Sequence, residues 1–342
     1  MSTFELRKDE ATAITELAGE LARQHPGVES AQFQKIGRVY ADELPRRLRA
    51  ELHDFRLAEP SGLLVISGLP VDDAALGPTP QDWKSRPTPS PTLSLDIAFY
   101  LVMSLLGEPI GWVTQQDGRI MHDVFPMRGF EREQIGWSSA ETLVWHTEDA
   151  FHPLRTDYLG LFCLRNPDKV ETTFAEVGSI HLDEATEALL REHRFLILPD
   201  DSHRPENRAP DRDDDPRVAD LKRRSYRQVE SALTDPKPLP VLFGAPDDPY
   251  LCVDPHYMQG IQGEAEEKAL ATLAAAVDAA MTGIVLEPGD ICVIDNYKAV
   301  HGRKPFRARF DGTDRWLRRL NVARDLRKSR EFRLDARSRV IY

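Results

Sequence analysis

Residues 144–153, Val-Trp-His-Thr-Glu-Asp-Ala-Phe-His-Pro, are the stretch around which the rest of the chain is organised. In an extended segment alternate side chains share a face, so His146 and Glu148 point together into one cavity. Trp145 and Thr147 then turn the other way. One imidazole, a carboxylate two residues later and one distant histidine form a 2-His-1-carboxylate facial triad, which binds a metal such as Fe(II) and leaves coordination positions open. We choose His301, in Ala299–Arg303, as the third ligand.

His-x-Glu is a weak signal by itself. With ten histidines and 56 acidic residues in 342 positions, chance gives roughly one or two His-x-Asp/Glu triplets, and two occur. The second, at residues 181–183, precedes a helical pattern in which Asp183 is typical of an N-cap. A structural histidine is therefore the alternative for His146, and the case for a metal ligand depends on the rest of the chain.

The bulk composition limits the class of protein. A hydrophobic content of 41% over 342 residues is enough for a real core. The net charge of −12 disfavours a nucleic-acid or anionic-membrane partner and is compatible with a small cationic ligand. Cys163, Cys252 and Cys292 lie in apolar runs without a C-x-x-C motif, as expected for reduced packing residues. Without a signal peptide or a long apolar run, we expect a cytoplasmic protein.

Helices and strands are expected in alternation along the chain. Apolar periodicity predicts helices at residues 9–24, 44–57, 93–106 and 264–281, the last closed by Gly283. Buried or alternating apolar runs predict strands at 62–68, 158–164, 241–243, 250–253 and 315–324. They also predict a strand followed by a turn within 112–118, and two strands around a Pro-Gly turn within 285–296. The proline-rich residues 77–92 are predicted to be an ordered loop.

Residues 199–238 differ in character from their surroundings. They are too charged for a core and too long for a simple connection, which predicts a surface lid or insert. The aspartates at 211–215 lack the glycine and distal glutamate of a calcium-binding loop, so we interpret them as a solvated charge run.

The strand predicted at residues 315–324 carries candidate anion-binding arginines. A period of two places Arg315 and Arg319 on one face and Arg318 on the other, and the first two are then about 13 Å apart. Such a pair can hold two different carboxylates on either side of a metal. A basic solvent-exposed edge is the alternative interpretation of the same pattern.

The motifs together resemble the clavaminate-synthase-like Fe(II)/2-oxoglutarate oxygenases. They are residues 146–151, followed by Arg155-Thr-Asp-Tyr158 and Leu164-Arg-Asn-Pro-Asp168, and later His301-Gly-Arg303 with residues 311–317. Within that family, the chain looks most like the arginine hydroxylases of viomycin and streptothricin pathways and the enduracididine hydroxylases. The resemblance spans residues 40–330 and would place the protein in antibiotic biosynthesis.

The resemblance implies a role for each matching residue. Fe(II) would bind to His146, Glu148 and His301, and 2-oxoglutarate would chelate the iron while its far carboxylate pairs with Arg315 and Thr172. A basic amino acid would be held at its backbone by Arg319, Gln115 and Glu148. Its guanidinium would be held by Asp254, Asp200 and Ser202.

One position departs from the family's pattern. The arginine enzymes have a second aspartate two residues after the position of Asp254, and this chain has His256. An imidazole cannot replace a carboxylate opposite a guanidinium, so the grip on the side chain is less well defined than the iron site.

The implied fold is mainly β with α: a double-stranded β-helix (jelly-roll) core within a single domain, residues 1–342. We expect a helical N-terminal part at 1–60, the core at 61–330 and the lid at 199–238. The implied reaction is hydroxylation at C3 or C4 of arginine or an arginine-derived amino acid, using O₂ and giving succinate and CO₂. Alternatives are hydroxylation of enduracididine or another basic amino acid, a zinc hydrolase, or a non-catalytic binder.

Overall fold

The computed structural model describes residues 1–85, 87, 89–203 and 215–342. The helices are α1 (Lys8–Gln24), α2 (Ala31–Ala41), α3 (Arg46–Ala58), α4 (Asp73–Leu76), α5 (Leu93–Ser104), α6 (Glu184–Leu190), α7 (Pro216–Thr234) and α8 (Glu264–Ala280). The strands are β1 (Ser2–Glu5), β2 (Leu63–Ser67), β3 (Glu108–Trp112), β4 (His122–Val124), β5 (Leu143–His146), β6 (Tyr158–Arg165), β7 (Glu171–Glu176), β8 (Leu242–Gly244), β9 (Pro249–Leu251), β10 (Thr282–Val285), β11 (Ile291–Asp295), β12 (Ala299–Arg303), β13 (Trp316–Ala323) and β14 (Val340–Ile341).

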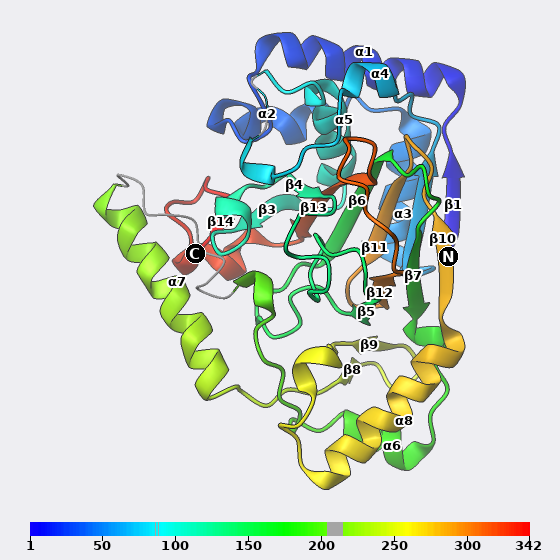
Figure 1. Ribbon diagram of the computed structural model, residues 1–342, viewed down its shortest axis with the longest axis vertical. Coiled ribbons are helices and arrows are strands. Elements are labelled where there is room, and N and C mark those ends of the chain that lie inside the picture. The colour runs from blue at the N-terminus through cyan, green and yellow to red at the C-terminus, as the bar shows by residue number, and fades with distance from the viewer. Residues whose placement is uncertain (86, 88, 204–214) are drawn as a thin grey trace.

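Two sheets form the centre of the molecule. The larger runs in the order β1-β2-β11-β6-β13-β3-β14, with β4 also pairing with β13, and the smaller runs β10-β7-β12-β5. Their neighbours are antiparallel except for β1 with β2 and β14 with β3. The fold is therefore mixed α and β. The sheets lie between an upper group of helices, α1, α2 and α5, and a lower group, α6 and α8, beside the β8–β9 hairpin (Figure 1).

Alternation along the strands explains this layering. In β6, Phe162 and Leu164 pack with the helices, whereas Leu161 and Cys163 pack with residues of the smaller sheet such as Phe174. Strands buried on both faces are expected to be apolar throughout, and every residue of β6 is buried. Helix α5 is also buried nearly all round, and Gly160 of β6 lets it approach closely, because a Cβ there would lie 2.7 Å from the Met103 side chain. The larger sheet thus provides a rigid wall for the site.

The face assignment of β13 is confirmed. Arg318 points into the helical layer, where it is buried and pairs with Asp123 and, at 2.8 Å, with Asp96 of α5. Arg315, just before the strand, and Arg319 open onto the other side, into the cavity described below. Breaking a buried ion pair costs about 3–5 kcal/mol, so Arg318 anchors the strand that presents the other two arginines.

Several boundaries differ from those predicted. Helices α2 and α7 and strand β1 were not predicted. The N-terminal part, predicted to be helical, therefore also contains a strand, which pairs with β2. Within 112–118 the predicted turn is present as a 3₁₀ turn at Gln116–Gly118, but the strand before it lies earlier than predicted, at Glu108–Trp112. Gly283 does not close α8, because it lies in β10 opposite Thr173.

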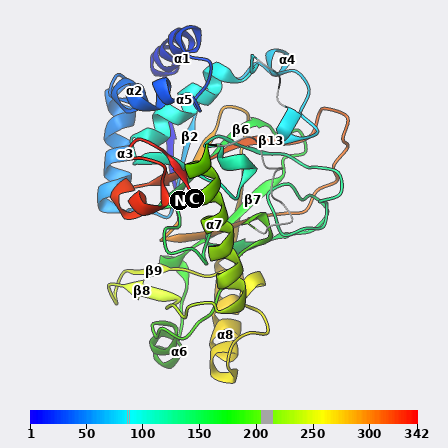
Figure 2. The same ribbon diagram turned by 90° about the vertical axis from the view of Figure 1, so that its left-hand side faces the viewer.

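Part of the expected lid lies outside the described residues. Residues 204–214, which include most of the aspartate run, are the part that is not described. Asp215, the last aspartate of the run, caps α7 by accepting from the Arg217 N–H at 2.8 Å. Helix α7 runs along the side of the molecule (Figure 2). Among the described residues, no helix is long and apolar enough to cross a membrane.

Candidate active site

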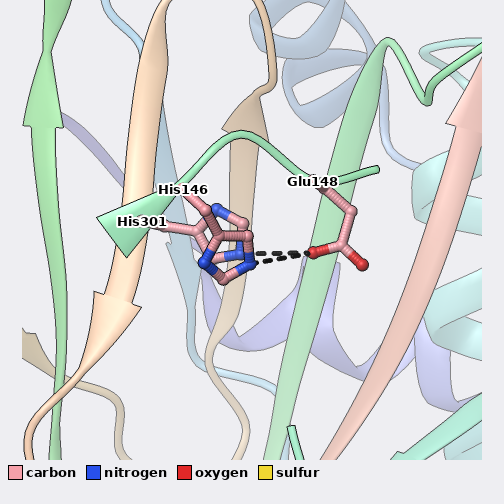
Figure 3. A group of neighbouring side chains, drawn as sticks. All are labelled: His146, Glu148 and His301. Atoms are coloured by element: carbon pink, nitrogen blue, oxygen red, sulfur yellow. Dashed lines mark ion pairs between the residues drawn. The ribbon is translucent and has the colours of Figure 1, made fainter. Parts of the chain in front are cut away.

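Three side chains from two adjacent strands meet at one point. His146 ends β5, and its register partner on β12 is His301, so their rings lie side by side with centroids 4.6 Å apart. Glu148 follows His146 by two residues, and its Oε2 lies 3.6 Å from His146 Nε2 and 3.5 Å from His301 Nε2 (Figure 3). The sequence prediction that these residues share a cavity is thus matched by the geometry.

The three donor atoms fit a transition-metal ion. Ligand atoms about 2.1 Å from one ion and separated by about 90–120° lie about 3.0–3.6 Å apart, as each histidine Nε2 and Glu148 Oε2 do. The His146 Nδ1 is 2.8 Å from the Val144 carbonyl, which fixes the tautomer that leaves Nε2 as the ligand atom. Two imidazoles and one carboxylate on one side are the donor set of a non-haem Fe(II) site.

The local backbone brings these ligands close together. Gly302 follows His301 where β12 and β5 shift register, and a Cβ there would lie 2.5 Å from the Leu143 carbonyl oxygen. A larger residue would push the two strands apart and separate the two histidines. Glycine is therefore required at this position.

Burial and neighbouring charges together set the protonation states of His146, Glu148 and His301. Burial alone would raise the pKa of Glu148, but Arg319 and the two histidines outweigh it and hold that pKa well below its usual range. Burial lowers the pKa of His301 and keeps its imidazole neutral. For His146 burial has the same effect, but Glu148 and Asp254 outweigh it and raise the pKa to about 9, so a proton competes with a metal for this nitrogen.

A buried cation lies on one side of the triad. Arg315 is 5% exposed, and its Nη2 donates to Thr172 Oγ1 at 3.2 Å while its Nε has no partner among the described residues. Burial lowers the pKa of Arg315 to about 10. The neighbouring Arg303 is also buried, donates to carbonyl oxygens and Ser138, and has its pKa lowered to about 9, first by burial and then by Arg315. Neither arginine pairs with a carboxylate in the described part of the chain, and two such cations make a site for an anionic group.

A second arginine lies on the other side. Arg319 Nη1 donates to Glu148 Oε1 at 2.6 Å, and its Nη2 donates to Gln115 Oε1 at 3.1 Å. Its Nη2 also lies 2.8 Å from His122 Nδ1. The two oxygens of Glu148 are thus divided between the histidines and Arg319. A zwitterion fits this arrangement, because its carboxylate matches Arg319 and its ammonium matches Glu148.

The far wall of the cavity is acidic. Asp200, Ser202 and Asp254 line it together with His256 and Tyr257. Burial raises the pKa of Asp254 to about 6, and the side chain accepts from the Tyr257 N–H at 3.3 Å. Burying an ionised carboxylate is costly unless a cation pairs with it, so this wall favours a positively charged group.

All the site residues predicted from the sequence line this one cavity. They are Gln115, His146, Glu148, Thr172, Asp200, Ser202, Asp254, His301, Arg315 and Arg319. His152, a nearby histidine four residues after Glu148, does not line it: its ring packs on Trp112 with centroids 4.3 Å apart, and burial lowers its pKa to about 3. Sequence reasoning missed Asp149 and Trp137 in the lining. It also missed His122, His203 and Asn296, which contact the lining residues Arg319, Asp149 and Glu148. Their partners are distant in the chain, so no local pattern marks them.

Comparisons with known proteins agree with this geometry. The pattern of the family described as "Taurine catabolism dioxygenase TauD, TfdA family" matches residues 97–321. The chain is 63% identical to enduracididine beta-hydroxylase of Streptomyces hygroscopicus and 43% identical to L-ornithine/L-arginine 3-hydroxylase of Catenulispora acidiphila, each over the full length of both chains. It also superposes on the crystal structure of the non-heme iron oxygenase OrfP in complex with Fe, succinate and (3S)-hydroxy-L-Arg, with a TM-score of 0.92 and 38% identity over the full length of both chains.

Proposed function

The chain belongs to the TauD, TfdA family of dioxygenases, and on this premise we propose that it hydroxylates C3 of a free, arginine-like amino acid. It is an Fe(II)/2-oxoglutarate-dependent oxygenase. The observation that carries the choice of substrate is one cavity with a metal triad at its centre, a buried cationic subsite on one side, and Arg319 with an acidic wall on the other.

We assign the metal to His146, Glu148 and His301. When bound, iron with 2-oxoglutarate and O₂ supplies the oxidising power for an unactivated C–H bond and releases succinate and CO₂. The chain's own task is to position the two organic molecules and exclude water. Arg315 and Thr172 would bind the distal carboxylate of 2-oxoglutarate, because Arg315 is a buried cation with unused hydrogen-bond donors.

The amino acid would lie across the opposite half of the cavity. Arg319 would bind its α-carboxylate in a bidentate fork, Gln115 would contact its backbone, and Glu148 Oε1 would accept from its ammonium. Asp200, Ser202 and Asp254 would bind the guanidinium. Fixing both ends leaves the middle of the side chain facing the metal, which accounts for reaction at C3 with C4 as the neighbouring alternative.

His256 favours an arginine derivative with fewer N–H groups. The acidic wall offers two aspartates, and His256 adds a single donor or acceptor in place of a third carboxylate. A cyclic guanidine such as that of enduracididine has fewer N–H donors to satisfy than arginine. This agrees with the name of the 63% identical relative. Free L-arginine is the other candidate.

We further propose a single domain whose two sheets form a double-stranded β-helix. Of the insert expected at 199–238, residues 199–203 and 215–238 are described, and Asp200 and Ser202 line the cavity. A cytoplasmic enzyme of antibiotic biosynthesis agrees with the three free buried cysteines and with the name of the Streptomyces relative.

Mass spectrometry of reactions with Fe(II), 2-oxoglutarate and a panel of amino acids tests this proposal. Enduracididine, L-arginine, L-ornithine and citrulline form the panel, with succinate measured in parallel. We expect a mass gain of one oxygen on a guanidino substrate, coupled to succinate. In an anaerobic titration with Fe(II) and 2-oxoglutarate, only the oxygenase should show the metal-to-ligand charge-transfer band of the chelate. A zinc hydrolase or a non-catalytic binder would give neither the band nor the oxidised product.

A further inference from the structure

Residues 199–203 bring two of the proposed side-chain contacts, Asp200 and Ser202, to the cavity, and they end on a deeply buried histidine. His203 is 1% exposed, and both of its ring nitrogens are occupied. Its Nε2 lies 2.8 Å from Asp149 Oδ1, and its Nδ1 lies 2.6 Å from Thr114 Oγ1. Phe151 packs against the ring edge to face with centroids 5.0 Å apart. A polar side chain held in this way fixes the backbone that carries it.

The backbone of the segment makes two bonds within the turn and one to the body of the protein. Asp200 Oδ1 accepts from the Ser202 N–H at 2.9 Å, and the Asp200 carbonyl accepts from the His203 N–H at 3.1 Å. The Asp201 N–H donates to the Tyr257 hydroxyl at 3.0 Å. The first two bonds shape the turn, and the third attaches it to the body of the protein. The His203 side chain provides a further attachment.

Gln115 connects this attachment to the other end of the substrate site. Its Nε2 donates to Ser202 Oγ at 2.9 Å and to Asp149 Oδ1 at 3.1 Å. Its Oε1 accepts from Arg319, the residue assigned to the α-carboxylate, at 3.1 Å. One amide thus joins the subsite for the amino acid's backbone to the segment that recognises its side chain.

We propose that His203 is a positioning residue for substrate recognition, which holds the 199–203 segment against Asp149 and Thr114 so that Asp200 and Ser202 meet the guanidino group. This inference rests on the proposed function. His203 touches no substrate, because it does not line the cavity among the described residues. It acts through the two residues before it.

The hydrogen bond between His203 and Asp149 cannot be replaced by an apolar side chain at position 203. Asp149 is 4% exposed, and its Oδ2 already lacks a partner within the described part of the chain. Burial lowers the pKa of His203, but Asp200 and Asp149 outweigh this effect and raise it. Removing the imidazole would leave Asp149 Oδ1 with Gln115 as its remaining donor, and a buried carboxylate attracts other donors or water when it loses a partner.

Two variants of His203 test the role. His203→Phe keeps a ring of similar size and loses both hydrogen bonds, whereas His203→Gln keeps a donor near the Nε2 position. We expect His203→Phe to raise KM for the guanidino substrate at least about tenfold and to increase succinate formed per product, with KM for 2-oxoglutarate within about twofold of wild type. His203→Gln should recover most of the loss. His193→Gln, at an exposed histidine, should match wild type.

A measurement without turnover separates this inference from the proposed function. Hydrogen exchange of the metal-free protein reports on the Asp201, Ser202 and His203 amides, which are bonded in the wild type. In His203→Phe their exchange should accelerate at least about tenfold while the β6 amides stay protected. Unchanged exchange in this segment, or a rise in both Michaelis constants together, would overturn the role of His203. Accelerated exchange with no amino acid oxidised by the wild type would refute only the proposed function.

Discussion

Replacing Arg315 should change the stability of the protein and its affinity for 2-oxoglutarate in opposite directions. Arg315 is buried, donates to Thr172 Oγ1 at 3.2 Å, and lies beside a second buried cation, Arg303. In the ligand-free protein this charge has no carboxylate partner among the described residues, so it costs stability. In the complex it would face the distal carboxylate of 2-oxoglutarate, where a charge-assisted fork contributes about 1.5–3 kcal/mol.

The magnitudes follow from these two states. Arg315→Lys keeps the charge and loses the fork, so we expect a rise of roughly ten- to a hundredfold in KM for 2-oxoglutarate. Arg315→Met leaves the ligand's carboxylate unpaired, at about 3–5 kcal/mol, and should weaken binding a hundredfold or more. The same Arg315→Met should raise the free energy of unfolding of the ligand-free protein by about 1–3 kcal/mol, because a buried unpaired charge is removed.

The assay is an anaerobic titration of 2-oxoglutarate into the Fe(II) protein, followed by the charge-transfer band, with urea unfolding of the ligand-free protein in parallel. Arg319→Lys is the matched control: it lies four residues further along the strand and should raise KM for the amino acid instead. Unchanged affinity of Arg315→Met for 2-oxoglutarate would refute the assignment. If Arg315→Lys and Arg319→Lys weakened the same ligand, the division of the two carboxylates between them would be wrong.

Three further predictions concern other residues. His301→Ala should abolish succinate formation and weaken Fe(II) binding without changing the thermal transition of the metal-free protein, and wild-type turnover would exclude His301 from the site. Asp254→Asn should lower activity on arginine much more than uncoupled 2-oxoglutarate turnover, and wild-type enzyme should use uncharged citrulline at least about tenfold less well than arginine; equal turnover of the two would rule out a guanidinium pocket. Burial raises the pKa of Asp295 to about 6, so the folded protein retains a proton that the unfolded chain releases, and this contribution to stability is lost as the pH rises from about 4 to 6. Asp295→Asn should therefore be more stable than wild type by about 1–3 kcal/mol at pH 7.5 but not at pH 4, as urea unfolding would measure; equal stability at pH 7.5 would contradict the raised pKa.

The site was more predictable than the elements around it. His146 and Glu148 share a face because of the period of an extended chain, and Arg315 and Arg319 share another for the same reason. Both patterns are local, so they can be read from the sequence. The meeting of these faces in one cavity depends on β12 pairing with β5 and β13 with β6, which are long-range pairings that composition does not specify. The resemblance to a family supplied that information.

Helices α2 and α7, which were not predicted, both have apolar residues at helical spacing among polar and charged ones. Helix α7 is rich in arginine, yet Tyr226 and Val229 lie three residues apart on its buried face, as an amphipathic helix requires. Helix α2 has Ser30 as its N-cap, with its side chain accepting from the Phe33 N–H at 3.2 Å, and buries Phe33, Gly37 and Ala41. In both helices the buried residues recur at helical spacing among polar residues. The spacing of the apolar residues indicates these helices, whereas the mean polarity of the segments does not.

Asn296 illustrates what sequence patterns cannot supply. Glu148 lies beyond the end of β5, followed by Asp149 in a left-handed conformation with φ 51°, so no strand ladder fixes it. Instead the Asn296 side chain accepts from the Glu148 N–H at 2.8 Å and donates to the Glu148 carbonyl at 3.0 Å and to the Thr156 carbonyl at 2.9 Å. One buried amide therefore holds the carboxylate ligand's peptide groups in place from 148 positions away. A facial triad needs its carboxylate fixed relative to two histidines on paired strands, and this clamp does so without extending the sheet into the space that the substrate must occupy.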